Sequence, residues 1–331
     1  MLALCDARRK ETIMSAISRR RFLQSSATAL AASASTFVPR AFSASTEPHL
    51  NFPSEPRQRL AVPSWPFRAF IEAPTNKWAR DPKVPGMDLK DFAAMAVKRF
   101  DVRNIEPLSD HFSSTEAGYL REFRANLEKA GARAVNIPAD LRYSFYDSVE
   151  ARREKAVGDG KKWIDVAVAI GSPSVRLHIA GAHNVKPDAD RTAESLKRVA
   201  EYGGQKNVLV NLENDDNVTE DPFFIVQVIE KVNHPYLHAL PDFCNSMLTH
   251  DQEFNNRAMD AMFKHAYNIS HMKDSEVGDK GKLFTVDVAK CFEIAKANGY
   301  RGYFSMEWEG QGEPYGGVQK LIEQSLANLG A

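Results

Sequence analysis

Four short apolar runs in the C-terminal half of the chain each end in a residue whose side chain can bind a metal ion. These residues are Glu213, Asp242, His271 and Glu307. They are separated by 29, 29 and 36 residues, which is the length of one strand, one helix and the loops that join them. The spacing therefore predicts that each residue holds the same place in one of four successive strand–helix units.

From residue 59 onward the whole chain alternates strand and helix patterns. Apolar runs predict eight strands with helical patterns between them. The strands are expected near residues 59–65, 101–106, 133–138, 174–179, 207–213, 236–242, 265–271 and 301–307. Eight such units predict one α/β domain over residues 59–331, a (β/α)8 TIM barrel. Gly171, Gly203, Gly204 and Gly299 are expected to end helices.

The four spaced residues lie where a barrel of this kind builds its chemistry. Functional side chains sit at the carboxyl ends of barrel strands, so four equivalent ends can direct their groups to one point. Strand alternation agrees, because it places Asn211 on the inner face with Glu213 and Ser305 with Glu307. Three carboxylates at one point would repel each other without a cation. For any one of these acids taken alone, a solvated loop position is the alternative.

The first 43 residues have the pattern of a twin-arginine export signal. Arg19 and Arg20 precede a Phe-Leu step, and a tract of small residues follows at 25–32. Ala41 and Ser43 offer small residues at both cleavage subsites. The alternative is a surface helix with a basic start, which leaves these features unconnected.

The predicted signal has consequences for location and partners. The twin-arginine translocase would export the folded, metal-loaded protein to the periplasm or to the outside of the cell. The apolar stretch is too short to remain as a helix across a membrane, and no permanent membrane span is expected. Residues 44–58 are polar and contain prolines, which predicts a surface linker. The true start is Met1 or Met14.

Charge and cysteine content exclude two classes of protein. Removing residues 1–43 leaves 36 basic and 41 acidic residues, a formal net charge of −5. This balance argues against a nucleic acid as partner. Cys244 and Cys291 remain, too few for a disulfide framework, so the fold has to rest on its core.

Short motifs around the four residues carry a family resemblance. They are Leu212-Glu213-Asn214, Pro241-Asp242, His271-Met272-Lys273-Asp274 and Met306-Glu307-Trp308-Glu309-Gly310. Over essentially the whole mature length the chain resembles the xylose isomerase-like barrel superfamily, often labelled sugar phosphate isomerase/epimerase. The resemblance implies that the four residues bind one divalent metal ion, usually Mn²⁺, Mg²⁺ or Co²⁺. The oxygen-rich set independently favours these ions over a structural zinc, and Zn²⁺ is the alternative.

The resemblance also implies a mechanism, in which Glu213 and Glu307 act as an acid/base pair on opposite faces of a sugar. A metal bridging the carbonyl and hydroxyl oxygens would stabilise the enediolate that forms when the adjacent carbon loses its proton. The family's ketose epimerases carry a histidine, an arginine and a glutamate where this chain has Asn245, Val277 and Thr219. These departures argue against a ketohexose epimerase and leave the superfamily resemblance intact.

Five further residues are expected to contact the substrate. They are Trp65, Glu106, His178, Asn245 and Lys273. Lys273 could polarise a substrate oxygen, and Trp65 could form a wall of the pocket. The alternatives are structural: hydrogen bonding for His178, loop ion pairing for Lys273 and plain packing for Trp65. Glu309 shares a face with Glu307 and is the alternative ligand at that strand.

The sequence thus predicts an exported, metal-dependent isomerase or epimerase that acts on a sugar or keto sugar by proton transfer next to a carbonyl. The nearest alternative is a lyase or dehydratase acting on inosose-like or 3-keto sugars, because the same groups can run an elimination. A non-catalytic carbohydrate-binding barrel is the third class. The pattern is compatible with a homo-oligomer. The absence of a Gly-rich phosphate loop argues against a phosphorylated substrate.

The export signal can be tested by changing Arg19 and Arg20 together to Lys. Because the twin-arginine route recognises that pair, we expect the double variant to stay in the cytoplasm. Cell fractionation of the variant and of the unchanged protein measures this. Normal secretion of the variant would show that the signal has been misidentified.

Overall fold

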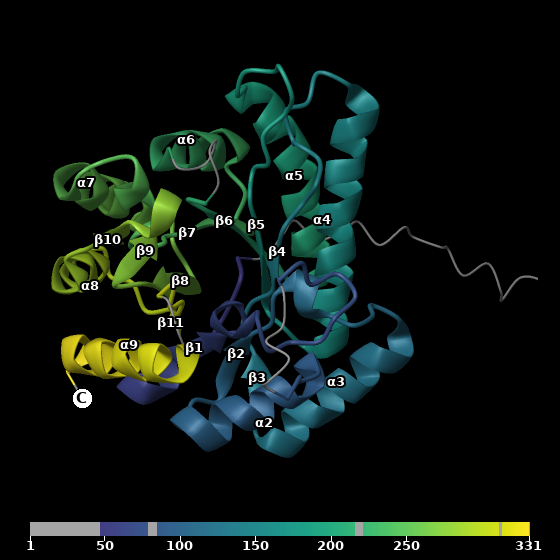
Figure 1. The fold of residues 1–331 in the computed structure, drawn as a ribbon. Helices are drawn as coiled ribbons and strands as arrows, with labels where there is room; N and C mark the ends of the chain where they lie inside the picture. Colours follow the sequence, from purple (N-terminus) through teal and green to yellow (C-terminus); the bar gives the residue numbers. More distant parts are fainter. Residues whose placement is uncertain (1–46, 79–84, 216–220, 311–312, 331) are drawn as a thin grey trace, which may run out of the picture. The chain divides into compact units, whose positions relative to one another are not determined.

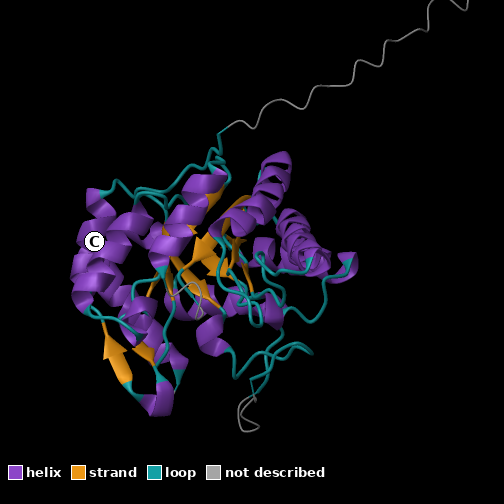
Figure 2. Ribbon diagram, turned by 90° about the horizontal axis from the view of Figure 1, so that it is seen from above, coloured by secondary structure: helices purple, strands orange, loops and turns teal. Residues whose placement is uncertain are grey.

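The computed structural model describes residues 47–78, 85–215, 221–310 and 313–330. The predicted export signal, the first part of the predicted linker and Thr219 lie outside these residues. Seen from above, the parallel strands form the centre of the described part and helices surround them, whereas the antiparallel hairpin strands lie at the edge (Figure 2). The predicted α/β barrel is confirmed.

Nine short parallel strands form the barrel wall, in two hydrogen-bonded ladders ordered β3-β2-β1-β11-β8 and β4-β5-β6-β7. Their bounds are β1 Leu60–Pro63, β2 Asn104–Glu106, β3 Arg133–Ala134, β4 Pro138–Ala139, β5 Ser174–Leu177, β6 Leu209–Glu213, β7 Leu237–Leu240, β8 Ile269–Met272 and β11 Tyr303–Met306. All eight predicted strands are found at their predicted places (Figure 1).

The third predicted strand is divided, because its backbone changes partner half-way. The Val135 N–H donates to the Ile105 carbonyl, whereas the Ile137 N–H donates to the Ser174 carbonyl. β3 therefore belongs to one ladder and β4 to the other, and together they join the two ladders on one side. On the other side β7 and β8 are joined by parallel bridges, one of which pairs Asp242 with His271. The sheet is thereby closed.

Among the described residues each barrel strand unit is followed by one α-helix. The helices are α2 Leu89–Phe100, α3 Ala117–Ala130, α4 Glu150–Ile170, α5 Ala189–Lys206, α6 Pro222–Val232, α7 Gln252–Phe263, α8 Val288–Ala297 and α9 Pro314–Leu329. None of them is long and apolar enough to cross a membrane. Gly171 ends α4 with a positive φ, as expected. Gly203 and Gly204 do not end a helix: α5 runs on to Asn207, whose own positive φ supplies the stop.

A hairpin between β8 and α8 was not predicted. Its strands β9 Ser275–Val277 and β10 Leu283–Thr285 are antiparallel. The hairpin begins three residues beyond β8, at the carboxyl end of the barrel. It therefore adds side chains to the same edge as the four predicted ligands.

The described part of the predicted linker packs across the opposite end of the barrel. The Tyr267 hydroxyl donates to the Pro48 carbonyl at 2.8 Å, and the Leu50 N–H donates to the Tyr267 oxygen at 3.3 Å. Phe52 makes edge contacts with the rings of Tyr267 and Tyr303. This segment covers the amino ends of β8 and β11.

We predict that Gly203→Ala destabilises the barrel, because a Cβ there would lie 2.5 Å from the Val208 carbonyl oxygen at the α5–β6 junction. Overpacking of this kind costs ~1–3 kcal/mol. Gly158→Ala in α4 is the matched control, because a Cβ there meets nothing within 4 Å. This change should stabilise by ~0.5–1 kcal/mol through helix propensity. Urea unfolding of both variants measures the difference, and equal midpoints would contradict the packing argument.

Candidate metal centre

The four spaced residues converge at the carboxyl end of the barrel. Glu213 is the last residue of β6, Asp242 lies two residues beyond β7, His271 is in β8 and Glu307 follows β11 directly. One ligand atom from each residue lies within 4.8 Å of the ligand atoms of the others. All four residues are buried. The fold therefore brings the predicted ligand set together.

His271 is oriented by Glu106 from the side opposite the ligand cluster. Its Nδ1 lies 2.6 Å from Glu213 Oε1 and 3.2 Å from Glu307 Oε2, while its Nε2 lies 3.1 Å from both oxygens of Glu106. A carboxylate can only accept, so Nε2 carries a proton. In a neutral ring the lone pair is then on Nδ1, facing the cluster. This is the carboxylate–histidine arrangement that orients metal ligands.

Glu106 is itself held by two further donors. The Ser305 hydroxyl and the Asn136 amide both donate to its oxygens. Burial by itself raises the pKa of the Glu106 carboxyl, but the charge of His271 and these hydrogen bonds outweigh it and hold the pKa below its usual value. Glu106 was expected to contact the substrate; it lines the cavity described below, with its carboxylate directed at His271.

The residues present fit a divalent cation. Asp242 Oδ1 accepts the backbone N–H groups of Cys244 and Asn245, whereas its Oδ2 is buried without a hydrogen-bond partner. Burial raises the pKa of Asp242 to about 8, and the nearby Glu307 and Glu213 carboxylates add to this, although the Lys273 charge opposes it. An ion bound by the four residues would satisfy the free oxygen and remove the repulsion between the acids.

In this structure the positive charge of His271 offsets part of that repulsion. Burial alone lowers the pKa of the imidazole, but the Glu213, Glu307 and Glu106 carboxylates raise it well above its usual value. Burial raises the pKa of Glu307, yet the charges of His271 and Lys273 outweigh this and hold that pKa well below its ordinary range. His271 and Lys273 thus supply positive charge that stabilises the carboxylates of the cluster.

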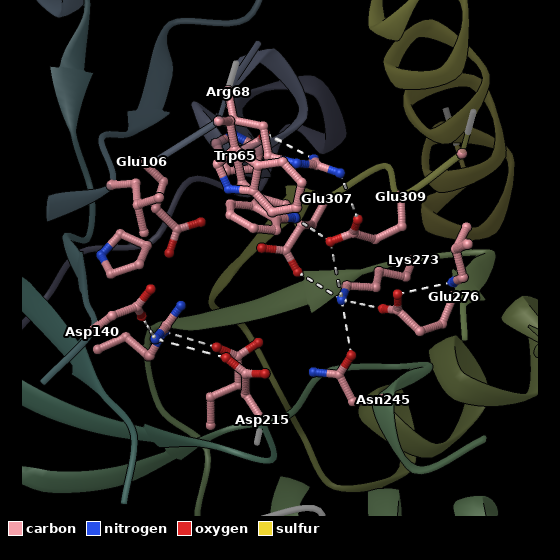
Figure 3. A pocket seen from close by; sticks show the side chains of 18 of the residues that line it. Trp65, Arg68, Glu106, Asp140, Asp215, Asn245, Lys273, Glu276, Glu307 and Glu309 are labelled. Atoms are coloured by element: carbon pink, nitrogen blue, oxygen red, sulfur yellow. Dashed lines mark hydrogen bonds and ion pairs between the residues drawn. The ribbon is translucent and has the colours of Figure 1, made fainter. Parts of the chain in front are cut away.

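A cavity of about 500 Å³ lies over the cluster. Lys273 forms part of its wall, with its Nζ 2.8 Å from Asn245 Oδ1, 2.7 Å from Glu276 Oε2 and 3.1 Å from Glu307 Oε2 (Figure 3). Glu276 is supplied by the unpredicted hairpin. Burial lowers the pKa of Lys273, but Asp242, Glu307 and Glu276 raise it well above its usual value, so the amine is charged.

Sequence reasoning missed Arg176 on β5. Its Nη1 lies 2.7 Å from Asp140 Oδ1, and its Nε lies 2.8 Å from Glu213 Oε2 in an ion pair that is not aligned as a hydrogen bond. Arg176 lines the cavity. His178, which was predicted instead, lies with its Nδ1 3.5 Å from Asp140 Oδ1 and is not among the described lining residues. His178 was chosen for its place at the strand end, and Arg176 lies two residues earlier on the same face of the strand.

Trp65 and Glu309 form a second contact group at the cavity. The Trp65 indole N–H donates to Glu309 Oε1, and Arg68 Nη2 lies 3.2 Å from Glu309 Oε2. Burial raises the pKa of Glu309 to about 7, opposed by the charge of Lys273. Both Glu309 oxygens thus face Trp65 and Arg68, and Glu307 is the acid that joins the cluster of four. Trp65, Asn245, Lys273 and Val277 all line the cavity.

Residues 92–329 match the family described as Xylose isomerase-like TIM barrel. The chain belongs to this family. A family protein from Mycobacterium smegmatis, solved in complex with magnesium, is 18% identical with a TM-score of 0.63 over 82% of this chain and 96% of that one. No curated protein sequence matches the chain significantly.

Two sugar epimerases are also similar in structure. A 3-keto-D-glucoside 4-epimerase from E. coli is 13% identical with a TM-score of 0.59, over 82% of this chain and 99% of that one. D-psicose 3-epimerase from Clostridium cellulolyticum, solved with D-tagatose, is 12% identical with a TM-score of 0.63, over 82% of this chain and 100% of that one. At these identities the similarity shows a shared fold.

We expect protein purified without chelator to carry about one divalent ion per chain, because four oxygen and nitrogen ligands converge. His271→Ala and Asp242→Asn should each weaken the affinity at least about tenfold, since even outer partners of metal ligands contribute ~10–100-fold. Elemental analysis and titration with Mn²⁺, Mg²⁺, Co²⁺ and Zn²⁺ measure this. Glu128→Ala, which removes an exposed carboxylate from α3, is the control. A folded protein that takes up none of these ions would contradict the assignment.

Proposed function

We propose that the protein is a metal-dependent sugar isomerase or epimerase that moves a proton at a carbon next to a carbonyl. The observation that carries the proposal is the convergence of Glu213, Asp242, His271 and Glu307 beneath a cavity of about 500 Å³. That volume lies within the range of small-molecule sites, ~300–1,000 Å³. Family membership and the sugar epimerases that share the fold support the same reading of the site.

Glu213, Asp242, His271 and Glu307 would hold the metal. When bound, a divalent cation would polarise the carbonyl and neighbouring hydroxyl oxygens of a substrate and offset the charge that develops there as the proton leaves. The oxygen-rich set favours Mn²⁺, Mg²⁺ or Co²⁺, with Zn²⁺ as the alternative. Glu106 acts as a positioning residue, because it fixes the ring and the protonated nitrogen of His271.

Glu213 and Glu307 are the proposed proton-transfer groups. Each lines the cavity and, besides His271, pairs with one cationic side chain: Arg176 Nε lies 2.8 Å from Glu213 and Lys273 Nζ lies 3.1 Å from Glu307. Burial raises the pKa of Glu307, but the charges of His271 and Lys273 hold it below its usual value, so its carboxylate is ionised. Arg176 and Lys273 thus help to hold the two acids in place. Lys273 and Asn245 are proposed to contact substrate oxygens.

The charge of the cavity wall favours an uncharged sugar. Among the described lining residues seven are carboxylic acids and three are cationic. Each of these cations is already close to a carboxylate, so a phosphate group would meet acidic side chains without an unpaired positive charge to bind it. The pairs are Arg68 with Glu309, Arg176 with Glu213, and Lys273 with Glu276.

A lyase is the second candidate, favoured by the buried amine of Lys273. Its Nζ is 3.1 Å from Glu307 and lies in the cavity wall. There it could donate a proton to a substrate hydroxyl group, which would then leave as water. The base would take the proton from the neighbouring carbon, and the carbon–oxygen bond would break to leave an alkene. Asn245 and Val277, which replace residues of the ketose epimerases, are consistent with this alternative.

We expect Glu213→Gln and Glu307→Gln each to lower exchange of a substrate's carbon-bound proton by ~10²–10⁴, because an amide cannot accept the proton. Deuterium incorporation from D₂O into a panel of keto sugars measures this, at saturating metal so that weakened metal binding is not mistaken for lost chemistry. Mass spectrometry of the products separates isomerisation from loss of water.

Glu128→Gln is the matched control for this experiment, because its carboxylate lies exposed on α3. It should exchange protons at the unchanged rate. Full exchange by both metal-loaded variants would show that other groups transfer the proton, and Lys273 would then be the first to test.

A further inference from the structure

A second cavity, of about 420 Å³, adjoins the cavity over the metal cluster. The two cavities share four lining residues: Trp65, Trp78, Leu108 and Asp140. A single sugar ring placed over Glu213 and Glu307 would leave the second cavity unfilled. The site is therefore larger than a monosaccharide requires.

Trp78 offers an aromatic face at the place where the cavities meet. It is 51% exposed, which is unusual for a residue with so much apolar surface. Trp65 meets it edge to face, with ring centroids 5.5 Å apart. The Arg68 guanidinium lies over both rings, 4.2 Å from the centroid of Trp65 and 4.8 Å from that of Trp78. The exposed indole is thus held by packing on its inner side and left open on the other.

The backbone that carries Trp78 is braced as well. The Trp78 N–H donates to Asn76 Oδ1, and the Asn76 amide donates to the carbonyls of Arg68 and Ile71, both at 2.8 Å. Both N–H groups of that side-chain amide and its oxygen take part in the brace. The aromatic face is therefore set before a ligand binds, which lowers the entropy cost of binding.

The edge of the second cavity supplies acceptors for hydroxyl groups. Asp140, whose side chain is 41% exposed, and Asp110 both line it. Among the described residues that line this cavity, Lys77 lies 3.8 Å from Asp110 and so has a carboxylate partner. One flat aromatic face with carboxylate oxygens around it matches a pyranose ring, which has an apolar C–H face and hydroxyl groups at its rim.

We propose that Trp65 and Trp78 form a second subsite that binds the outer ring of an uncharged glycoside while the inner ring lies over the metal cluster. The inference rests on the proposed function and names its substrate class: a disaccharide or other glycoside. Arg68 links the two parts of the site, because it packs on Trp78. It also pairs with Glu309, two residues beyond Glu307 (Figure 3).

Calorimetric titration of the Mn²⁺-loaded full chain tests this. The probes are D-glucose, D-fructose and methyl β-D-glucoside as single rings, with cellobiose, maltose, sucrose and trehalose as two-ring sugars of different linkage. We expect at least one two-ring sugar to bind about tenfold more tightly than the best single ring, from the apolar surface it covers on the indole. Trp78→Ala should remove most of that advantage, and Trp78→Phe should keep most of it.

Phe223→Ala, which removes another exposed aromatic side chain and one that lines neither cavity, is the matched control and should leave the ratio unchanged. Two-ring sugars that bind no better than single rings would overturn the second subsite alone, and so would an advantage that survives Trp78→Ala. Failure of the metal-loaded protein to bind any of these sugars would count against the proposed function as well. Circular dichroism of each variant shows that the fold is retained.

Discussion

Buried negative charge at the carboxyl ends of the strands is the constraint on which the rest of the site depends. Glu213, Asp242 and Glu307 face one imidazole, and Glu106 faces its other side. Burying so many acids is unfavourable unless positive charge compensates them. Burial lowers the pKa of His271, but the neighbouring carboxylates raise it well above its usual value, which favours a positive charge on the ring. A divalent ion bound by the cluster would need the ring in its neutral form, so its binding would depend on pH.

The backbone of the barrel makes the cluster rigid. The His271 N–H donates to the Pro241 carbonyl, and the Phe243 N–H donates to the His271 carbonyl, so Asp242 and His271 are tied by sheet hydrogen bonds. Ser305 pairs with His271 in the β8–β11 register and donates to Glu106. The candidate ligands Asp242 and His271 therefore belong to one hydrogen-bonded surface with Ser305, the donor that holds Glu106. Little reorganisation would be needed when an ion binds.

The sequence was informative wherever a residue's role follows from its place along one strand. Buried parallel strands are apolar runs, so the strands could be located, and Glu213 to Glu307 could be placed by their repeated spacing. Strand alternation places Arg176 on the same face as His178, but its pairing with Asp140 and Glu213 joins different parts of the barrel, which no local pattern reveals. The hairpin that supplies Glu276 is too short to show a period. Glu106 was located at its strand end, but its direction toward His271 depends on barrel closure, a tertiary property.

The segment at Phe52 lies at the end of the barrel opposite the cavity. Its contacts with Tyr267 and Tyr303 cover the amino ends of the strands, whereas Trp78 and the β9–β10 hairpin border the cavity at the carboxyl ends. The described chain thus enters the barrel on the face remote from the cavity. A tether or solid support joined ahead of residue 47 would hold the protein at the amino ends of β8 and β11 and leave the cavity at the carboxyl ends facing solution.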